Sequence, residues 1–91
     1  MELKWTSKAL SDLARLYDFL VLASKPAAAR TVQSLTQAPV ILLTHPRMGE
    51  QLFQFEPREV RRIFAGEYEI RYELNGQTIH VLRLWHTREN R

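Results

Sequence analysis

The 91 residues of this chain allow one domain with a small core, and 45% hydrophobic with 25% charged residues excludes a disordered segment. The absence of cysteine excludes disulfides, thiolate metal sites and thiol catalysis, and no apolar run approaches the length of a membrane span. We therefore expect a single domain over residues 1–91, cytoplasmic, with no membrane partner and a net charge of +3 that suits an acidic protein or a nucleic acid.

The first part of the chain predicts a short strand followed by a helix. Residues 2–6 alternate in hydropathy, and Ser7 can cap the helix that follows. Apolar side chains then recur at helical spacing, namely Leu10, Leu13, Leu16, Tyr17 and Leu20. The solvent face of this helix is expected to carry Lys8, Ser11, Asp12, Arg15 and Asp18. Lys25-Pro26 ends the helix, and Pro26 can start the next one.

A second helix is predicted from about residue 27 to residue 43, with Ala28, Val32 and Leu35 on its buried side. Pro39 conflicts with an unbroken helix, because a proline removes one hydrogen bond and clashes with the preceding turn. We expect a kink or a break near residues 37–38. The joint between the two helices is short, so they should form an antiparallel hairpin.

The second half of the chain predicts three strands. Residues 58–65 form the first, residues 68–74 alternate cleanly, and residues 77–85 complete a hairpin around Asn75-Gly76, for which we expect a type I′ turn. The last strand is apolar on both faces, with Ile79, Val81 and Trp85 opposite Leu82 and Leu84, as expected of a central strand. The predicted fold is α+β, in the order β-α-α-β-β-β, with the helical hairpin on one face of a mainly antiparallel sheet.

Arginine dominates the basic residues of the chain. Ten of the thirteen basic residues are arginine, and seven of these lie between Arg58 and Arg91. Guanidinium groups suit two-point binding of carboxylates or phosphates, so these arginines are candidates for binding a target. The alternative is that Arg58, Arg61 and Arg62 pair with neighbouring glutamates on a solvated strand edge.

The last apolar run ends in a polar cluster that holds His86, Arg88 and Glu89. A strand end on a rigid scaffold can aim such side chains at a partner, and a histidine there can act as acid or base. His80 is interpreted as partly buried, and His45 as assisting a helix end. Tyr68 and Tyr72 are interpreted as core residues. The histidine spacing predicts no metal site, and the chain has no motif for a cofactor.

The order of these elements, together with short motifs along the whole chain, resembles the RelE/ParE superfamily of bacterial toxins. The motifs are Trp5, Ala9, Asp12-Leu13 and Tyr17, then Ala27-Ala28, Leu42-Leu43-Thr44-His45-Pro46 and Gly49, then Arg62, Tyr68-Glu69-Ile70-Arg71-Tyr72, Ile79-His80-Val81-Leu82 and His86-Thr87-Arg88-Glu89. The strand-end motif is more similar to the ParE branch than to the ribonuclease branch, since the lysine cluster and C-terminal tyrosine of many ribonucleases are missing.

The resemblance implies the toxin of a type II toxin–antitoxin system, held inactive by a cognate antitoxin. A ParE-like member would inhibit DNA gyrase by binding, without catalysis and without a cofactor. The first alternative is a metal-independent endoribonuclease that cleaves mRNA on the ribosome, for which His86, Arg62 and Arg88 would be the catalytic residues. A further alternative is an inactive interaction partner of the antitoxin.

Two sets of binding residues follow from this interpretation. The target-binding set comprises Arg58, Arg61, Arg62, Arg71, Trp85, His86 and Arg88. The antitoxin-binding set comprises Trp5, Leu16 and Phe19, which are expected to leave apolar surface beside the helical hairpin. We expect a helix of the antitoxin to lie in the groove between the hairpin and the sheet.

Overall fold

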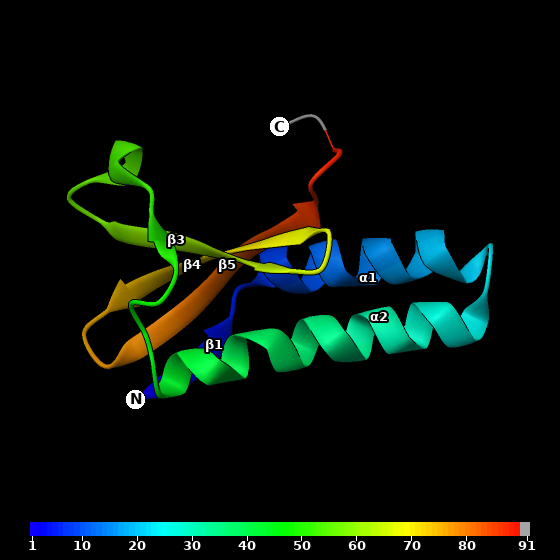
Figure 1. The fold of residues 1–91 in the computed structure, drawn as a ribbon, viewed down its shortest axis with the longest axis horizontal. Helices are drawn as coiled ribbons and strands as arrows, with labels where there is room; N and C mark the ends of the chain where they lie inside the picture. Colours follow the sequence, from blue (N-terminus) through cyan, green and yellow to red (C-terminus); the bar gives the residue numbers. More distant parts are fainter. Residues whose placement is uncertain (90–91) are drawn as a thin grey trace.

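A computed structural model describes residues 1–89 as two layers, a sheet with a helical hairpin on one face (Figure 1). The elements are β1 (Glu2–Trp5), α1 (Ser7–Val21), α2 (Lys25–Gln37), the 3-10 helix η1 (Ala38–Leu43), β2 (Glu50–Gln51), the 3-10 turn η2 (Phe53–Phe55), β3 (Glu59–Ala65), β4 (Tyr68–Asn75) and β5 (Thr78–His86). This arrangement confirms the predicted α+β fold and helical hairpin. The short edge strand β2 was not predicted.

The strands lie in the order β1-β5-β4-β3-β2. β5 is central, as predicted, because it pairs parallel with β1 and antiparallel with β4. All other pairs are antiparallel. The chain therefore places its first strand against its last, so that the end of β5 lies beside the start of α1.

The start of α1 differs from the sequence prediction. Thr6, not Ser7, is the N-cap, and its hydroxyl accepts a hydrogen bond from the Ala9 N–H at 3.1 Å. Leu10, predicted on the buried face, is 53% exposed, and Asp12, predicted on the solvent face, is only 2% exposed, so both assignments are wrong. The buried stripe of α1 consists of Ala9, Asp12 and Leu16, which share one face at spacings of three and four residues.

The predicted break at Pro39 is confirmed. α2 ends at Gln37 and the chain continues as η1, with Pro39 fully buried. The tighter 3-10 winding accommodates the missing N–H of the proline without a sharp bend. Of the predicted buried stripe, Ala28 and Leu35 are buried and Val32 is half-buried.

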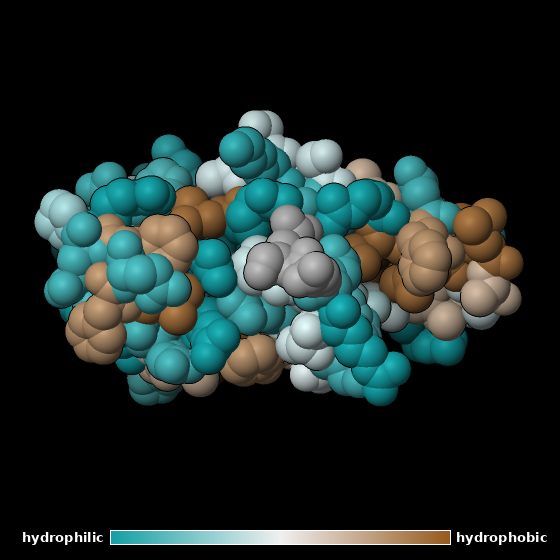
Figure 2. Space-filling view, turned by 90° about the horizontal axis from the view of Figure 1, so that it is seen from above, coloured by the Kyte–Doolittle hydropathy of each residue, from teal (hydrophilic) through white to brown (hydrophobic). Residues whose placement is uncertain are grey.

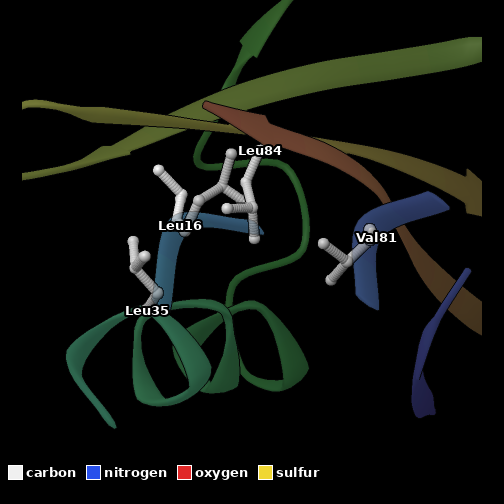
Figure 3. Packing of buried hydrophobic residues seen from close by; sticks show 6 residues of the cluster. Leu16, Leu35, Val81 and Leu84 are labelled. Carbon is white, nitrogen blue, oxygen red and sulfur yellow. The ribbon is translucent and has the colours of Figure 1, made fainter. Parts of the chain in front are cut away.

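The main core lies between the helical hairpin and the sheet. Leu16 of α1 and Leu35 of α2 point towards Leu84 of β5 in Figure 3. Tyr72 continues this core towards η1 and is completely buried, as the sequence predicted. Tyr68 is half-buried at the rim of the same core.

Both tight turns of the sheet use a glycine with positive φ. Gly66 has φ 60° between Ala65 and Tyr68, and Gly76 has φ 61° between the paired residues Asn75 and Thr78. Among residues 1–89, glycines alone have positive φ. The predicted type I′ turn at Asn75-Gly76 is therefore wrong. Glycine at the first central position is the pattern of a type II′ turn.

A bulge in β5 changes which side chains share a face. Arg71 pairs with Arg83 and Tyr72 with Val81, so Leu82 is an extra residue in the ladder. After this bulge Leu84 continues the helix-facing row of Val81, whereas Trp85 lies on the far face. The prediction that Trp85 shares a face with Val81 is therefore wrong, because simple alternation does not include the extra residue.

Candidate functional site

The end of β5 extends past β1, and α1 replaces the missing strand. β1 ends at Trp5, so the outer edge of β5 has no strand partner beyond that point. The Thr6 hydroxyl donates to the Leu82 carbonyl at 2.9 Å, and the Leu84 N–H donates to the Asp12 carboxylate at 3.0 Å. The buried Asp12 thus gives a strand N–H that has no partner strand its hydrogen-bond acceptor, and it fixes the strand to the helix.

The same carboxylate binds the neighbouring guanidinium group. Arg83 donates from Nε and Nη2 to the two oxygens of Asp12, at 2.7 and 3.1 Å. Burial alone would raise the pKa of Asp12, but the hydrogen bonds from Arg83 and from the Leu84 N–H outweigh it and lower the pKa. Asp12 therefore stays ionised at neutral pH and holds the strand end in place.

The residues after β5 fold back on this anchor. Glu89 accepts a hydrogen bond from the His86 backbone N–H at 3.2 Å, and its carboxylate lies 3.7 Å from Arg15. Arg15 in turn lies 3.5 Å from Asp12. These contacts fix the position of Glu89 beside α1, and the predicted cluster continues through Asn90 and Arg91, which lie outside the described residues.

The His86 ring is held in place by the residues that follow it in the chain. Its Nδ1 accepts the backbone N–H of Arg88 at 3.0 Å, so the proton of the neutral ring lies on Nε2. Nε2 is 4.0 Å from the Glu67 carboxylate, and the Tyr68 ring packs edge-on at 5.2 Å between centroids. His86 is therefore half-buried in a fixed orientation.

Two hollows flank the Tyr68–His86 pair. The larger, ≈ 660 Å³, lies against α1 and is lined by Arg15, Leu16, Phe19, Leu20, Tyr68, His86, Arg88 and Glu89. The smaller, ≈ 350 Å³, lies against α2 and includes Arg30, Ser34 and Glu67. The helical hairpin continues beyond these hollows to an apolar tip, where Phe19 is 70% and Leu22 85% exposed. Figure 2 shows hydrophobic surface at that end of the molecule.

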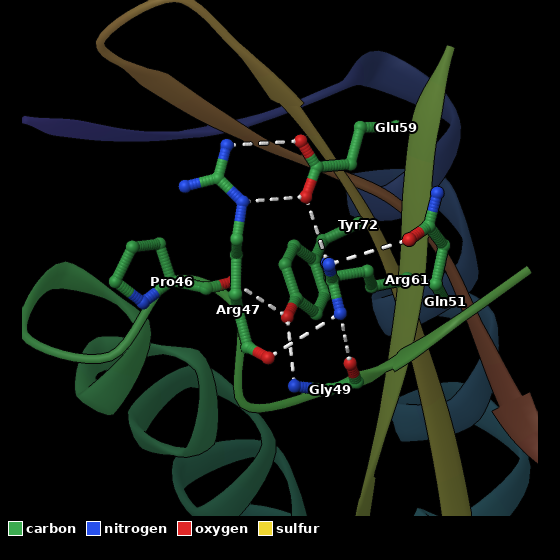
Figure 4. A network of polar contacts seen from close by, with 7 residues as sticks. All are labelled: Pro46, Arg47, Gly49, Gln51, Glu59, Arg61 and Tyr72. Atoms are coloured by element: carbon green, nitrogen blue, oxygen red, sulfur yellow. Dashed lines mark hydrogen bonds and ion pairs between the residues drawn. The ribbon is translucent and has the colours of Figure 1, made fainter. Parts of the chain in front are cut away.

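The arginines of the sheet are mostly paired within the protein. Arg61, with a side chain 14% exposed, donates to Glu59 at 2.9 Å and to the Gly49 carbonyl at 2.8 Å (Figure 4). Arg47 binds the same Glu59 through two hydrogen bonds, and the hydrogen bond from Arg47 leads the causes that lower the pKa of Glu59. Arg58 makes an equivalent two-point contact with Glu73.

The face away from the helices carries a second network. Arg62 contacts Glu50 at 2.9 Å and Glu69 at 3.4 Å. Arg71 contacts the same Glu69 and lies between two aromatic rings, 5.2 Å from Phe55 and 4.8 Å from Trp85. Of the predicted target-binding residues, Trp85 is 6% exposed, and Arg58, Arg61 and Arg62 are paired with glutamates as in the alternative reading. Their part in target binding stays a prediction.

The three predicted ribonuclease residues do not form one group. Arg62 lies on the face away from the helices, because its neighbour Ile63 packs into the helix-side core. His86 lies in the row of Ala65 and Tyr68, beside the hollows at the helices. Arg88 is close to His86 in the chain, but its side chain is 85% exposed and lies 3.9 Å from Glu67.

The predicted antitoxin residues also differ in exposure. Phe19 is freely exposed and Trp5 is half-buried, whereas Leu16 is 6% exposed and belongs to the core. Leu16 therefore contributes little exposed surface, because it lies on the buried stripe of α1, although it lines the floor of the larger hollow, and its role in antitoxin binding stays a prediction. Asp12 and Glu89 were missed as anchors of the strand end. The spacing of Ala9, Asp12 and Leu16 was the signal for Asp12.

Within residues 1–89 no group of three or more acidic or histidine side chains could hold a metal ion. None of the helices in that range is long and apolar enough to cross a membrane. His45 is exposed and its backbone N–H donates to the Ile41 carbonyl at 2.9 Å, which closes the end of η1. The hollows around Tyr68 and His86 therefore remain the main candidate site.

Comparison with known proteins gives a consistent result. Residues 3–91 match the family described as ParE toxin of type II toxin-antitoxin system, parDE. A protein named Toxin RelE1, from Caulobacter vibrioides, is 36% identical over 85 residues, which cover 92% of this chain and 90% of that protein. A solved structure titled Chromosomal ParDE TA system from P. aeruginosa superimposes with a TM-score of 0.80 at 28% identity, over 94% of this chain and 95% of the other. A fold, a length and a sequence profile that all agree mean that the chain belongs to the ParE toxin family of type II toxin–antitoxin systems.

Proposed function

We propose that this toxin acts by binding DNA gyrase rather than by catalysis, and that a cognate antitoxin neutralises it in the cytoplasm. The family assignment supports a toxin with an antitoxin partner. The choice of target rests on the candidate site. There a fixed histidine, an exposed arginine and an apolar helix surface adjoin one another, as suits a protein partner.

The observation that carries this proposal is the separation of Arg62 from His86. Cleavage of RNA through a ribose 2′-hydroxyl needs a base, an acid and cations around one phosphate. In this protein Arg62 is bound to Glu50 and Glu69 on the face away from the helices. His86 lies at the hollows on the helix side. A single phosphate cannot contact both side chains without rearrangement of the sheet.

The antitoxin is proposed to cover the larger hollow. Its lining along α1 is apolar at Leu16, Phe19 and Leu20, while Arg15 and Arg88 stand at its rim. An amphipathic helix with acidic residues on its polar side would match this combination of surfaces. Trp5, the last residue of β1, is half-buried and does not line this hollow, so it would bind the antitoxin only if the contact extends beyond the hollow.

The test is expression of the toxin in growing cells with two readouts from the same culture. We expect filamentation and induction of the DNA-damage response first, with loss of protein synthesis later. In vitro, the purified toxin should inhibit supercoiling by gyrase and increase the amount of cleaved DNA held by gyrase. Coexpressed antitoxin should suppress both effects. Early arrest of translation with an unchanged damage response would refute the gyrase proposal.

The second candidate, a ribosome-dependent endoribonuclease, is favoured by the state of His86. Nδ1 of the ring is occupied by the Arg88 N–H, which leaves Nε2 for a substrate, and the ring lines both hollows beside the Tyr68 ring. A histidine in that position suits proton transfer to or from a bound substrate. This activity would be detected as cleavage of mRNA in a purified translation system. We expect none, and cleavage that disappears with His86→Ala would establish the enzyme.

A further inference from the structure

The outer edge of β1 is open on one side. β1 is the first strand in the sheet order and pairs only with β5 among the described strands. The Glu2 N–H donates to Gln77 and the Thr6 N–H to Val81. Because strand N–H groups alternate in direction, those of Leu3 and Trp5 point away from β5. This edge offers a row of backbone groups to another strand.

The side chains of β1 divide by face. Leu3 and Trp5 pack against the helix-side core, so Glu2 and Lys4 lie together on the other face, and both are exposed. Edge strands are commonly protected by charged side chains, above all lysine, because lysines on two identical strands repel each other. Here the two charges have opposite sign and stand symmetrically on either side of Leu3.

We infer that two copies of this toxin associate through antiparallel pairing of β1 with β1 of a second copy, centred on Leu3. In this register the outward N–H and C=O groups of Leu3 bond with those of the other Leu3. Glu2 of each copy then stands opposite Lys4 of the other, so each cross-strand pair is of opposite charge. A shift of this register by a residue in either direction loses that match.

Exposed apolar side chains next to β1 also favour a second copy of the toxin as the binding partner. η1 packs against β1 and lies beside it at the same corner of the molecule as the N-terminus in Figure 1. On η1, Val40 is 44%, Ile41 46% and Leu43 40% exposed, and Met1 is 49% exposed. A four-residue strand buries too little area for a stable dimer, so burial of these side chains is needed to hold the copies together. The association is independent of the toxin's target.

Charge reversal tests the register. The untagged toxin should show a concentration-dependent increase in mass by light scattering and sedimentation. Glu2→Lys and Lys4→Glu each convert both cross-strand pairs to like charges, so each variant should dissociate at concentrations at least about tenfold higher than wild type. An equimolar mixture of the two variants should recover dimers, because positions 2 and 4 are then both positive in one copy and both negative in the other. The mixture is expected to behave like wild type.

Two further variants keep the test interpretable. Ile41→Glu should also abolish the dimer, whereas Leu22→Glu, at the opposite end of the molecule and 85% exposed, should leave it intact. Circular dichroism should show that all variants remain folded. A wild-type toxin that stays monomeric at every concentration overturns the inference. So does a mixture of Glu2→Lys and Lys4→Glu that associates no better than either variant alone.

Discussion

Arg61 and Arg88 carry the same guanidinium group but lie in contrasting environments. Arg61 is 14% exposed and is engaged by Glu59 and a backbone carbonyl, whereas Arg88 is 85% exposed beside a single distant glutamate. The same contrast separates the arginines of β3 and β4, which are paired, from the end of β5, where an arginine and a histidine border an open hollow. A cluster of arginines in the sequence therefore overstates the positive charge available to a partner, because each glutamate of the sheet neutralises part of it.

The largest expected effect comes from loosening the anchor of the strand end. Asp12→Ala removes the partner of Arg83 and of the buried Leu84 N–H, and we expect a loss of about 3 kcal/mol in the free energy of unfolding. Chemical denaturation of the purified protein measures this. Asp18→Ala, on the exposed side of the same helix, is the matched control and should change stability by less than about 0.5 kcal/mol. Equal effects of both substitutions would show that Asp12 is not an anchor.

The paired region can be disrupted at Gly49. A Cβ there would lie 2.6 Å from the Tyr72 hydroxyl and 2.7 Å from the Arg62 carbonyl, so Gly49→Ala should cost about 2 kcal/mol. The hydroxyl of Tyr72 donates to the Pro46 carbonyl and accepts the Gly49 N–H (Figure 4). Tyr72→Phe should cost about 1 kcal/mol. The double variant should lose less than the sum, because one clash is gone, and strictly additive losses would contradict this contact.

Arg61→Ala and Arg88→Ala sharpen the comparison directly. Arg61→Ala should lower the melting temperature, because the Gly49 carbonyl loses its donor from Arg61 and Glu59 keeps only its contacts with Arg47, at a cost of about 1 kcal/mol. Arg88→Ala should leave the melting temperature unchanged but weaken binding to gyrase about tenfold, as for an exposed interface arginine. Calorimetry and a gyrase binding assay distinguish the two outcomes. The comparison fails if Arg88→Ala destabilises the fold while Arg61→Ala does not.

A smaller effect is expected for His86→Ala. A binding toxin should lose less than about 1 kcal/mol of target affinity and remain toxic, as for a peripheral contact. A general acid or base would instead account for about 10²–10⁴-fold in rate, so toxicity would vanish. Growth after induction gives the answer, provided that the variant is folded and still binds its antitoxin. Full recovery of growth would overturn the proposal of a non-enzymatic toxin.

The smallest effect is expected from mild acid. The pKa values of Asp12, Glu59 and Glu73 are lowered from their ordinary values of 3.8 and 4.5 by hydrogen bonds from arginines. A carboxylate whose pKa is lower in the folded than in the unfolded state stabilises the protein at every pH above its unfolded-state pKa. This stabilisation is lost as the pH falls through the folded-state pKa. Stability should therefore stay nearly constant from neutral pH to about pH 5 and decrease only below it. A decrease already near pH 6 would point to a different group.

The parts of the fold that could be predicted are those that depend on residues close together in the sequence. The helical hairpin, the break at Pro39 and four of the five described strands follow from spacing and turn residues close together in the chain. The misplaced features depend on distant contacts. Asp12 is buried because the strand end needs an acceptor at that point, 72 residues further along the chain. Thr6 caps α1 while its hydroxyl also reaches Leu82. The periodicity of the sequence does not reveal hydrogen bonds between residues that are so far apart in the chain.

The candidate site was predicted in part. The strand end at His86 was found from the abrupt change of composition, and the structure places it beside two hollows. The sequence does not decide whether the other arginines are paired, because the formation of an ion pair between an arginine and a glutamate depends on the strand register. That register aligns Arg62 of β3 with Glu50 of β2 and brings the exposed Arg58 near Glu73. Such alignment becomes visible only once the strands are assembled.

The extra residue at Leu82 has a consequence for how this toxin can change over generations. Because of this extra residue, the side chains from Arg83 to His86 alternate between the two faces of the sheet with a shift of one residue relative to the first half of β5. Loss or gain of a single codon in this stretch would turn Leu84 and Trp85 to the opposite sides while leaving the first half of the strand undisturbed. Because both side chains are buried, such an event would exchange their packing partners and move His86 from the helix side of the sheet to the other face. The single extra residue at Leu82 therefore decides on which face of the sheet the candidate site is built.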